Sequence, residues 1–152
     1  MKKLLALILL IGISIPANAQ NLNEKLYEAV AKNDLKKTEK LINKGADVNF
    51  VKKSGPWMKV SLLITAVNNK NNEITKILLK NKADVNWKDG FKTSAILYAA
   101  NSGNTELLKL LLNYGANIND NDGQGNTVLT AARESENPKM IELVEKEINK
   151  EK

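Results

Sequence analysis

The chain has 152 residues, which is enough for one domain, and it contains neither histidine nor cysteine. The lack of these two residue types excludes serine–histidine and cysteine–histidine catalysis, haem ligation and ordinary zinc sites. The formal net charge is +6 at pH 7, and Arg133 is the sole arginine. The bias toward lysine and asparagine is typical of an AT-rich coding sequence, so the positive charge does not by itself indicate an anionic partner.

Residues 1–19 have the pattern of a secretory signal peptide. Two lysines precede an apolar run over 4–15, and small residues then offer a cleavage site between Ala19 and Gln20. The run is too short to span a bilayer comfortably, and no cysteine follows it for lipid attachment. We therefore expect cleavage, a mature net charge of +4 and a periplasmic or secreted bacterial protein without a membrane span. An uncleaved N-terminus would leave a cytoplasmic role open.

The segment 21–49 predicts a pair of short helices. Asn23 can cap a first helix, and a second helix begins at Asp34 and closes at Gly45, which can adopt the left-handed conformation. Helices of about ten residues are unstable alone in water, so the pair must bury an apolar face against something else.

Three further segments repeat this organisation. Four-residue motifs that begin at Ala46, Ala83 and Ala116 lie 37 and then 33 positions apart, and each follows an alanine of its first helix by 17 positions. The repeat predicts four units: about 21–49, 50–86, 87–119 and 120–152. Lys37 and Lys40 in the first unit replace residues that are apolar in the second and third, as expected of a terminal unit with one face in water.

Polar residues are expected to begin the later helices. Three of them can cap the first helices of their units: Ser61, Ser94 and Asn126. Asn137 can cap the last helix, with Pro138 at its first position. Lys70 and Lys82 stand where the third unit has helix-ending glycines, which predicts a cost in backbone strain.

The alanine spacing, the leucine run 110–112 and the motif 115–119 (Gly-Ala-Asn-Ile-Asn) resemble the ankyrin repeat, which joins a turn and two helices within about 33 residues. The resemblance covers the chain from about Asn21 onward. It implies an all-α solenoid of four stacked helix pairs, in one domain over 20–152, with short β-hairpin fingers between units. The family's histidine is missing from all four units, which puts the rigidity between repeats in question.

The resemblance places fingers at 50–60, 87–93 and 120–125. The first is four residues longer than the second and is expected to turn at 54–56, a Ser-Gly-Pro sequence. The second is expected to turn tightly at Asp89-Gly90. The third is polar and rich in glycine.

The first two fingers hold every tryptophan and phenylalanine of the chain: Phe50, Trp57, Trp87 and Phe91. With Met58, these side chains are candidate partner contacts, because aromatic anchors dominate interface energetics. Five lysines flank them and join the candidate site: Lys52, Lys53, Lys59, Lys88 and Lys92. In the alternative interpretation, the aromatic residues pack finger against finger, Phe50 and Trp87 cover helix ends, and the lysines solubilise an exposed edge.

The acidic residues have structural explanations. Asp47 and Asp84 recur at the helix-to-finger junction, where a short carboxylate can satisfy local backbone groups. Asp120 and Asp122 resemble the opening of a calcium loop but lack the downstream glutamate, so a polar turn is expected. We expect no catalytic residues, no metal site and no cofactor.

These features predict an exported, non-catalytic protein–protein interaction module, acting as a monomer through its fingers and concave helix surface. The alternative is charge-driven binding of an anionic envelope polymer or nucleic acid through the finger lysines, with affinity that falls steeply with salt. Nucleic acid is the less expected partner, because the net charge is low and arginine is nearly absent. An enzyme would need a catalytic constellation that the residues do not supply.

Overall fold

The computed structural model describes residues 17–150, with side chains from residue 21 onward. Most of the predicted signal peptide, 1–16, lies outside the described residues. The predicted cleavage bond between Ala19 and Gln20 falls within the first helix. None of the helices in the described part is long and apolar enough to cross a membrane.

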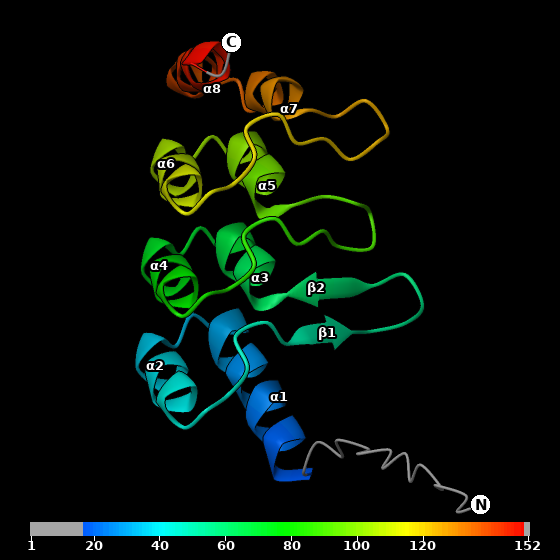
Figure 1. Cartoon of the computed structure of the whole chain (residues 1–152), viewed down its shortest axis with the longest axis vertical. Coiled ribbons are helices and arrows are strands. Elements are labelled where there is room, and N and C mark those ends of the chain that lie inside the picture. The colour runs from blue at the N-terminus through cyan, green and yellow to red at the C-terminus, as the bar shows by residue number, and fades with distance from the viewer. Residues whose placement is uncertain (1–16, 151–152) are drawn as a thin grey trace, which may run out of the picture.

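The described residues form helix pairs that stack in chain order into a solenoid (Figure 1), which confirms the predicted fold class. The inner helices α1, α3, α5 and α7 lie next to the projecting loops, and the outer helices lie on the far side. The pairs have these bounds: α1 (Ala17–Ala31) with α2 (Leu35–Asn43), α3 (Leu62–Asn68) with α4 (Asn72–Lys80), α5 (Ala95–Asn101) with α6 (Thr105–Asn113), and α7 (Val128–Glu134) with α8 (Pro138–Lys150).

One apolar core runs through the whole stack. Its inner layer repeats a buried alanine in every unit, at Ala29, Ala66, Ala99 and Ala132. A side chain of one carbon lets neighbouring inner helices approach closely without opening a cavity. Lys37 of the first unit is exposed, as predicted for a terminal repeat.

Most helix starts follow the predicted caps. The Ser61 hydroxyl accepts a hydrogen bond from the backbone N–H of Ile64, and Asn137 accepts one at the start of α8. Ser94 occupies the N-cap position of α5, but its hydroxyl donates to the carboxylate of Asp120 in the third finger. A predicted local cap is thus used for a contact between finger and helix.

Two predicted caps are wrong. Asn23 lies inside α1, which begins earlier, and its side chain accepts a hydrogen bond from the backbone N–H of Asp47 at 2.8 Å. Thr127, rather than Asn126, is the N-cap of α7. The amide of Asn126 instead donates to the carboxylate of Asp122, so it belongs to the finger.

Two lysines carry the expected backbone strain. Lys70 and Lys82 have φ angles of 54° and 67°, and the corresponding Gly103 and Gly115 have φ angles of 69° and 86°. The helix-ending turn therefore keeps its left-handed geometry even where a side chain makes that geometry costly.

The fingers differ in their regularity. The first is a hairpin in which β1 (Val51–Lys53) pairs antiparallel with β2 (Lys59–Ser61), and the expected turn lies between them. The other two are held by single bridges, Lys88 to Ser94 and Asn121 to Thr127. The predicted two-residue turn of the second finger is wrong: the turn extends to Lys92, and Lys92, with a φ of 60°, takes the left-handed position.

Candidate functional site

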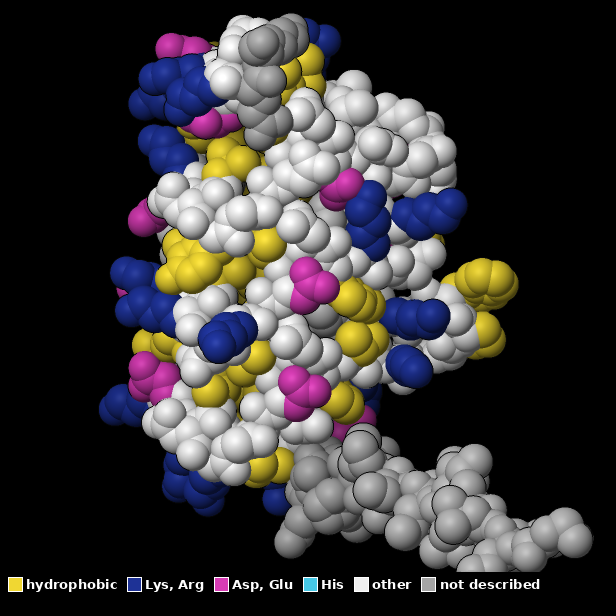
Figure 2. All heavy atoms as spheres, in the orientation of Figure 1, with side chains coloured by type: hydrophobic (Ala, Val, Ile, Leu, Met, Phe, Trp, Pro, Cys, Tyr) yellow, Lys and Arg dark blue, Asp and Glu magenta, His cyan; other side chains and the backbone are white. Residues whose placement is uncertain are grey.

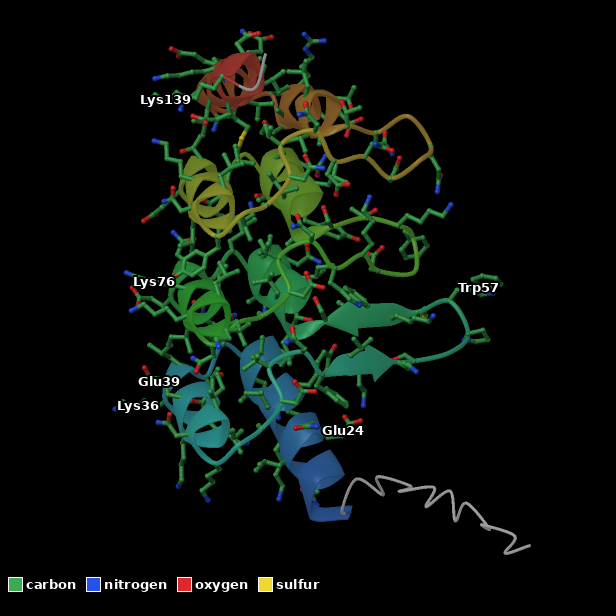
Figure 3. All side chains as sticks on the ribbon, in the orientation of Figure 1. Glu24, Lys36, Glu39, Trp57, Lys76 and Lys139 are labelled. Atoms are coloured by element: carbon green, nitrogen blue, oxygen red, sulfur yellow. The ribbon has the colours of Figure 1, made fainter. Side chains whose placement is uncertain are left out.

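The outer ends of the first two fingers carry three exposed apolar side chains. Trp57, Met58 and Phe91 expose 77%, 61% and 63% of their surface. Figure 2 shows hydrophobic side chains at the far end of the first finger, with lysines nearer the helices and on the loop above it. Figure 3 labels Trp57 at this outer end, on the opposite side of the molecule from the outer helices. Large apolar groups exposed to water at the ends of projecting loops are typical of a binding surface.

The two fingers touch each other at their ends. Gly90 of the second finger lies against the backbone of Trp57, so closely that a Cβ at position 90 would collide with the Trp57 oxygen. The side chains of Trp57 and Phe91 therefore belong to one surface, although 34 positions separate them in the chain.

Phe50 and Trp87 lie at the finger bases and pack against the core as half-buried side chains. Trp87 lines a depression of about 200 Å³ together with Val48, Leu63 and Ala83. This placement matches the interpretation in which both residues cover helix ends. Their role as partner contacts stays a prediction.

Two of the five candidate lysines are engaged within the fold. The Nζ of Lys52 lies 2.6 Å from a carboxylate oxygen of Glu24 and 5.8 Å from the ring centroid of Tyr27. The hydrogen bond to Glu24 raises the pKa of Lys52 above its ordinary value. Lys88 contacts Asp120 at 2.5 Å and donates to the backbone oxygen of Asn121 at 2.7 Å.

The other three lysines are free. Lys53, Lys59 and Lys92 are exposed, and none of them makes an ion pair with another described residue. Their charges therefore face solvent beside the apolar ends of the fingers. The five candidate lysines thus fall into two groups: two form ion pairs with other units of the stack, and three are exposed to solvent without an ion pair to a described residue.

An inner groove lies between the fingers and the inner helices of the third and fourth units. A pocket of about 130 Å³ in this groove is lined by residues that include Leu97, Tyr98, Asn101, Asp122 and Glu134. Its polar groups are already paired with one another or with the fingers. The hydroxyl of Tyr98 donates to Asp89 at 2.6 Å, and the amide of Asn101 donates to Glu134 at 3.1 Å. Burial, followed by the bond to Asp89, raises the pKa of Tyr98 above its ordinary value.

The third finger is a polar turn. Asp122 accepts hydrogen bonds from the backbone N–H groups of Gln124 and Asn126 and from the Asn126 amide. The Gln124 bond is the largest cause that lowers the pKa of Asp122. Asp120 is engaged elsewhere, with Lys88 and Ser94. Within the described residues, no group of three or more acidic side chains converges as metal ligands would.

Asparagines join successive units, a role that the sequence pattern alone had not suggested. The Asn49 side chain accepts from the backbone N–H of Asp84 at 2.8 Å and donates to the backbone oxygen of Lys82 at 3.2 Å. Asn86 repeats this arrangement one unit later, with Asn117 and Gly115. The signal was present in the sequence, because each four-residue motif ends in asparagine.

The predicted role of the recurring aspartates is confirmed. The Asp47 carboxylate accepts from the backbone N–H of Asn49 at 2.8 Å, and Asp84 accepts from that of Asn86 at 3.0 Å. These carboxylates hold the turn that leads each second helix into the next finger.

A protein-family model described as ankyrin repeats (3 copies) matches residues 62–152. No match to the chain is found among curated proteins.

Proposed function

This chain belongs to the ankyrin repeat family, whose domains are typically non-catalytic protein-binding modules, and we propose that it is exported and holds its partner with the first two fingers. The observation that carries this proposal is the exposure of Trp57, Met58 and Phe91 at the ends of two fingers in contact. The fold buries most of its other large apolar side chains, but these three are exposed to water and add no hydrophobic stabilisation to it. They would contribute such stabilisation only when another molecule covers them.

Backbone contacts hold the three exposed side chains in place. The first finger is a paired hairpin, and Gly90 anchors the second finger against it. Because the fingers are ordered before binding, a partner would lose less free energy to their ordering than it would with flexible loops. Anchoring side chains of this size account for most of the binding energy in protein interfaces.

Capture of the partner by crosslinking tests this site. A photoreactive amino acid at position 54, in the exposed turn of the first finger, should crosslink to one protein of the cell envelope, and the same group at position 76 should not. Lys76 is a matched control position because it lies on α4, on the far side from the fingers (Figure 3).

Alanine substitution supplies the second arm of this test. Joint replacement of Trp57, Met58 and Phe91 by alanine should abolish capture, because the anchoring surface is lost. The helical circular dichroism should remain, because these side chains are exposed and support no core packing. Unchanged capture by a folded triple variant would reject the finger site.

Export is proposed from the pattern of residues 1–19, a basic start, an apolar run and a small-residue cleavage site. The mature protein should begin at Gln20 and be found in the periplasm or the medium. Mass measurement of the protein purified from its own host decides this, and an intact N-terminus would contradict it.

A second candidate function, binding of an anionic polymer, has one observation in its favour: Lys53, Lys59 and Lys92 are exposed and free of ion pairs with described residues. Binding of this kind should weaken steeply as salt rises and should not depend on the apolar side chains. Titration with a polyanion at several salt concentrations, for wild type and for the triple alanine variant, separates the two functions.

A further inference from the structure

The hairpin register sets two free lysines directly against each other. Lys53 of β1 pairs with Lys59 of β2, so their side chains emerge on the same face of the hairpin. Like charges at directly opposed positions destabilise a hairpin. The fold therefore maintains a local repulsion that a negative charge from outside would relieve.

This pair faces away from the inner helices. Lys52 and Val60 form the neighbouring cross-strand pair, on the other face of the hairpin, and Lys52 reaches Glu24 and Tyr27 of α1. Because successive residues of a strand alternate between faces, Lys53 and Lys59 lie on the face turned outward from the groove.

The second finger adds a third free charge to the same surface. Lys92 follows Phe91 directly and is exposed. The nearby carboxylate of Asp89 is occupied by the Tyr98 hydroxyl and by the backbone N–H groups of Phe91 and Thr93. The first two fingers, 50–60 and 87–93, together carry five lysines and one acidic residue, Asp89. Positive charge thus predominates around the exposed apolar side chains.

The inner groove offers less to a partner. Its polar side chains are largely engaged: Tyr98 with Asp89, Asn101 with Glu134, and Asp122 with Asn126. A ligand in the groove would compete with these bonds, whereas a ligand at the finger ends would meet exposed lysines that make no ion pair with other described residues.

We infer that the partner presents an acidic segment around an apolar side chain, and that it docks on the ends and outward face of the first two fingers rather than in the inner groove. This inference rests on the proposed function, that the fingers bind a protein. It adds the chemistry of the partner and the face on which it sits. Charge complementarity of this kind selects partners and speeds association.

Selection of peptides from a random library tests this chemistry directly. The library is displayed on phage and selected against the full chain. Enriched peptides should combine acidic residues with an aromatic or aliphatic one. They should lose binding to the Trp57, Met58 and Phe91 triple alanine variant, yet bind Asn101→Ala normally, because Asn101 lines the groove and bonds Glu134 rather than a finger. Enrichment of basic or neutral peptides, or dependence on Asn101, would overturn the inference.

Lys53→Glu separates a binding role from a structural one. It turns a repulsive cross-strand pair into an attractive one, so the hairpin should be at least as stable as in the wild type. Binding of an enriched acidic peptide should nevertheless weaken by about fivefold or more. The double variant Lys53→Glu/Lys59→Glu keeps the repulsion, reverses its sign and should weaken binding further. The matched control Lys76→Glu, an equal charge change on the outer side of the same unit, should alter affinity by less than about twofold.

The outcomes distinguish the two proposals. If the triple alanine variant loses the crosslinked partner while Lys53→Glu binds like wild type, the acidic partner is rejected and the finger site stands. If the triple variant keeps the partner, the proposed function fails. Binding of phosphatidylglycerol vesicles or a DNA oligonucleotide that is independent of Trp57, Met58 and Phe91, without acidic peptide binding, would overturn the inference in favour of a non-protein anion.

Discussion

Gly90 lies so close to Trp57 that a Cβ on Gly90 would stand 1.7 Å from the Trp57 backbone oxygen. No side chain can occupy that position without moving one finger away from the other. The contact joins two consecutive fingers at their ends, where the exposed apolar residues lie. A single hydrogen atom at position 90 thus decides whether these residues form one surface or two.

Gly90→Ala should force the fingers apart. The added methyl meets backbone rather than a flexible side chain, so we expect the free energy of unfolding to fall by about 1–3 kcal/mol. Crosslinking from position 54 should fall as well, because Trp57 and Phe91 no longer share a surface. Urea denaturation and the crosslinking assay measure the two effects.

Gly123→Ala is the control for this prediction. Gly123 has a φ of 74° and open space around it, so alanine there meets a conformational cost but no collision. We expect a loss of about 1 kcal/mol and normal crosslinking. Normal crosslinking by a folded Gly90→Ala variant would contradict the joint surface.

Asn49→Ala should loosen the joint between the second unit and its neighbour. The substitution removes the acceptor for the Asp84 N–H and the donor to the Lys82 backbone oxygen. We expect the free energy of unfolding to fall by about 1 kcal/mol, because the site is exposed and water replaces part of both bonds. Asn49→Asp keeps the acceptor and should lose less. The control Asn81→Ala removes only a bond to Ile77 within its own turn of helix, and should cost the least. If urea denaturation showed equal losses of stability in all three variants, Asn49 would not join the two units.

Lys82→Gly should stabilise the protein. Lys82 has a φ of 67°, a backbone conformation that costs a residue with a side chain about 1–2 kcal/mol and that glycine adopts without this cost. Glycine also has more conformational freedom in the unfolded chain, and this offsets part of the stabilisation. We expect a net gain of up to about 1 kcal/mol in the free energy of unfolding. Lys80→Gly, two positions earlier at the last residue of α4, should instead lower the free energy of unfolding by up to about 1 kcal/mol. Because both variants lose a lysine charge, a gain of stability in one and a loss in the other cannot come from that charge. A loss of stability in both variants would show that Lys82 is not strained.

Tyr98→Phe should reveal a stability term that depends on pH. Because the pKa of Tyr98 is raised in the folded state, the folded protein holds this proton more tightly than the unfolded chain does. The contribution is complete below the ordinary tyrosine pKa of about 10 and is lost as the pH rises above it. The free energy of unfolding of the wild type should exceed that of Tyr98→Phe by about 1 kcal/mol near neutral pH, and this difference should shrink above about pH 10. A difference that stays constant to high pH, in urea denaturation, would contradict it.

The sequence by itself determined the repeat architecture. In a solenoid each unit contacts only its neighbours, so the same apolar positions recur at a nearly fixed spacing and can be read along the chain. The exposed ends of the first two fingers were predictable for a related reason: Trp57 and Phe91 break the repeat pattern, and they lie outside the helices that bury most of the remaining apolar residues.

The tertiary structure decided how polar residues are used, because their partners lie one unit away. Asn49 forms a hydrogen bond with a residue 35 positions later, and Ser94 forms one with a residue 26 positions later. Neither bond can therefore be recognised from the neighbouring residues in the sequence. Asparagine, attributed in the sequence to a coding bias, proves to join the units. Among the finger lysines, Lys52 and Lys53 are adjacent in sequence, yet one is paired with Glu24 and the other is free. Strand alternation sends them to opposite faces of the hairpin, and only the stacked units determine which face meets a helix and which meets solvent.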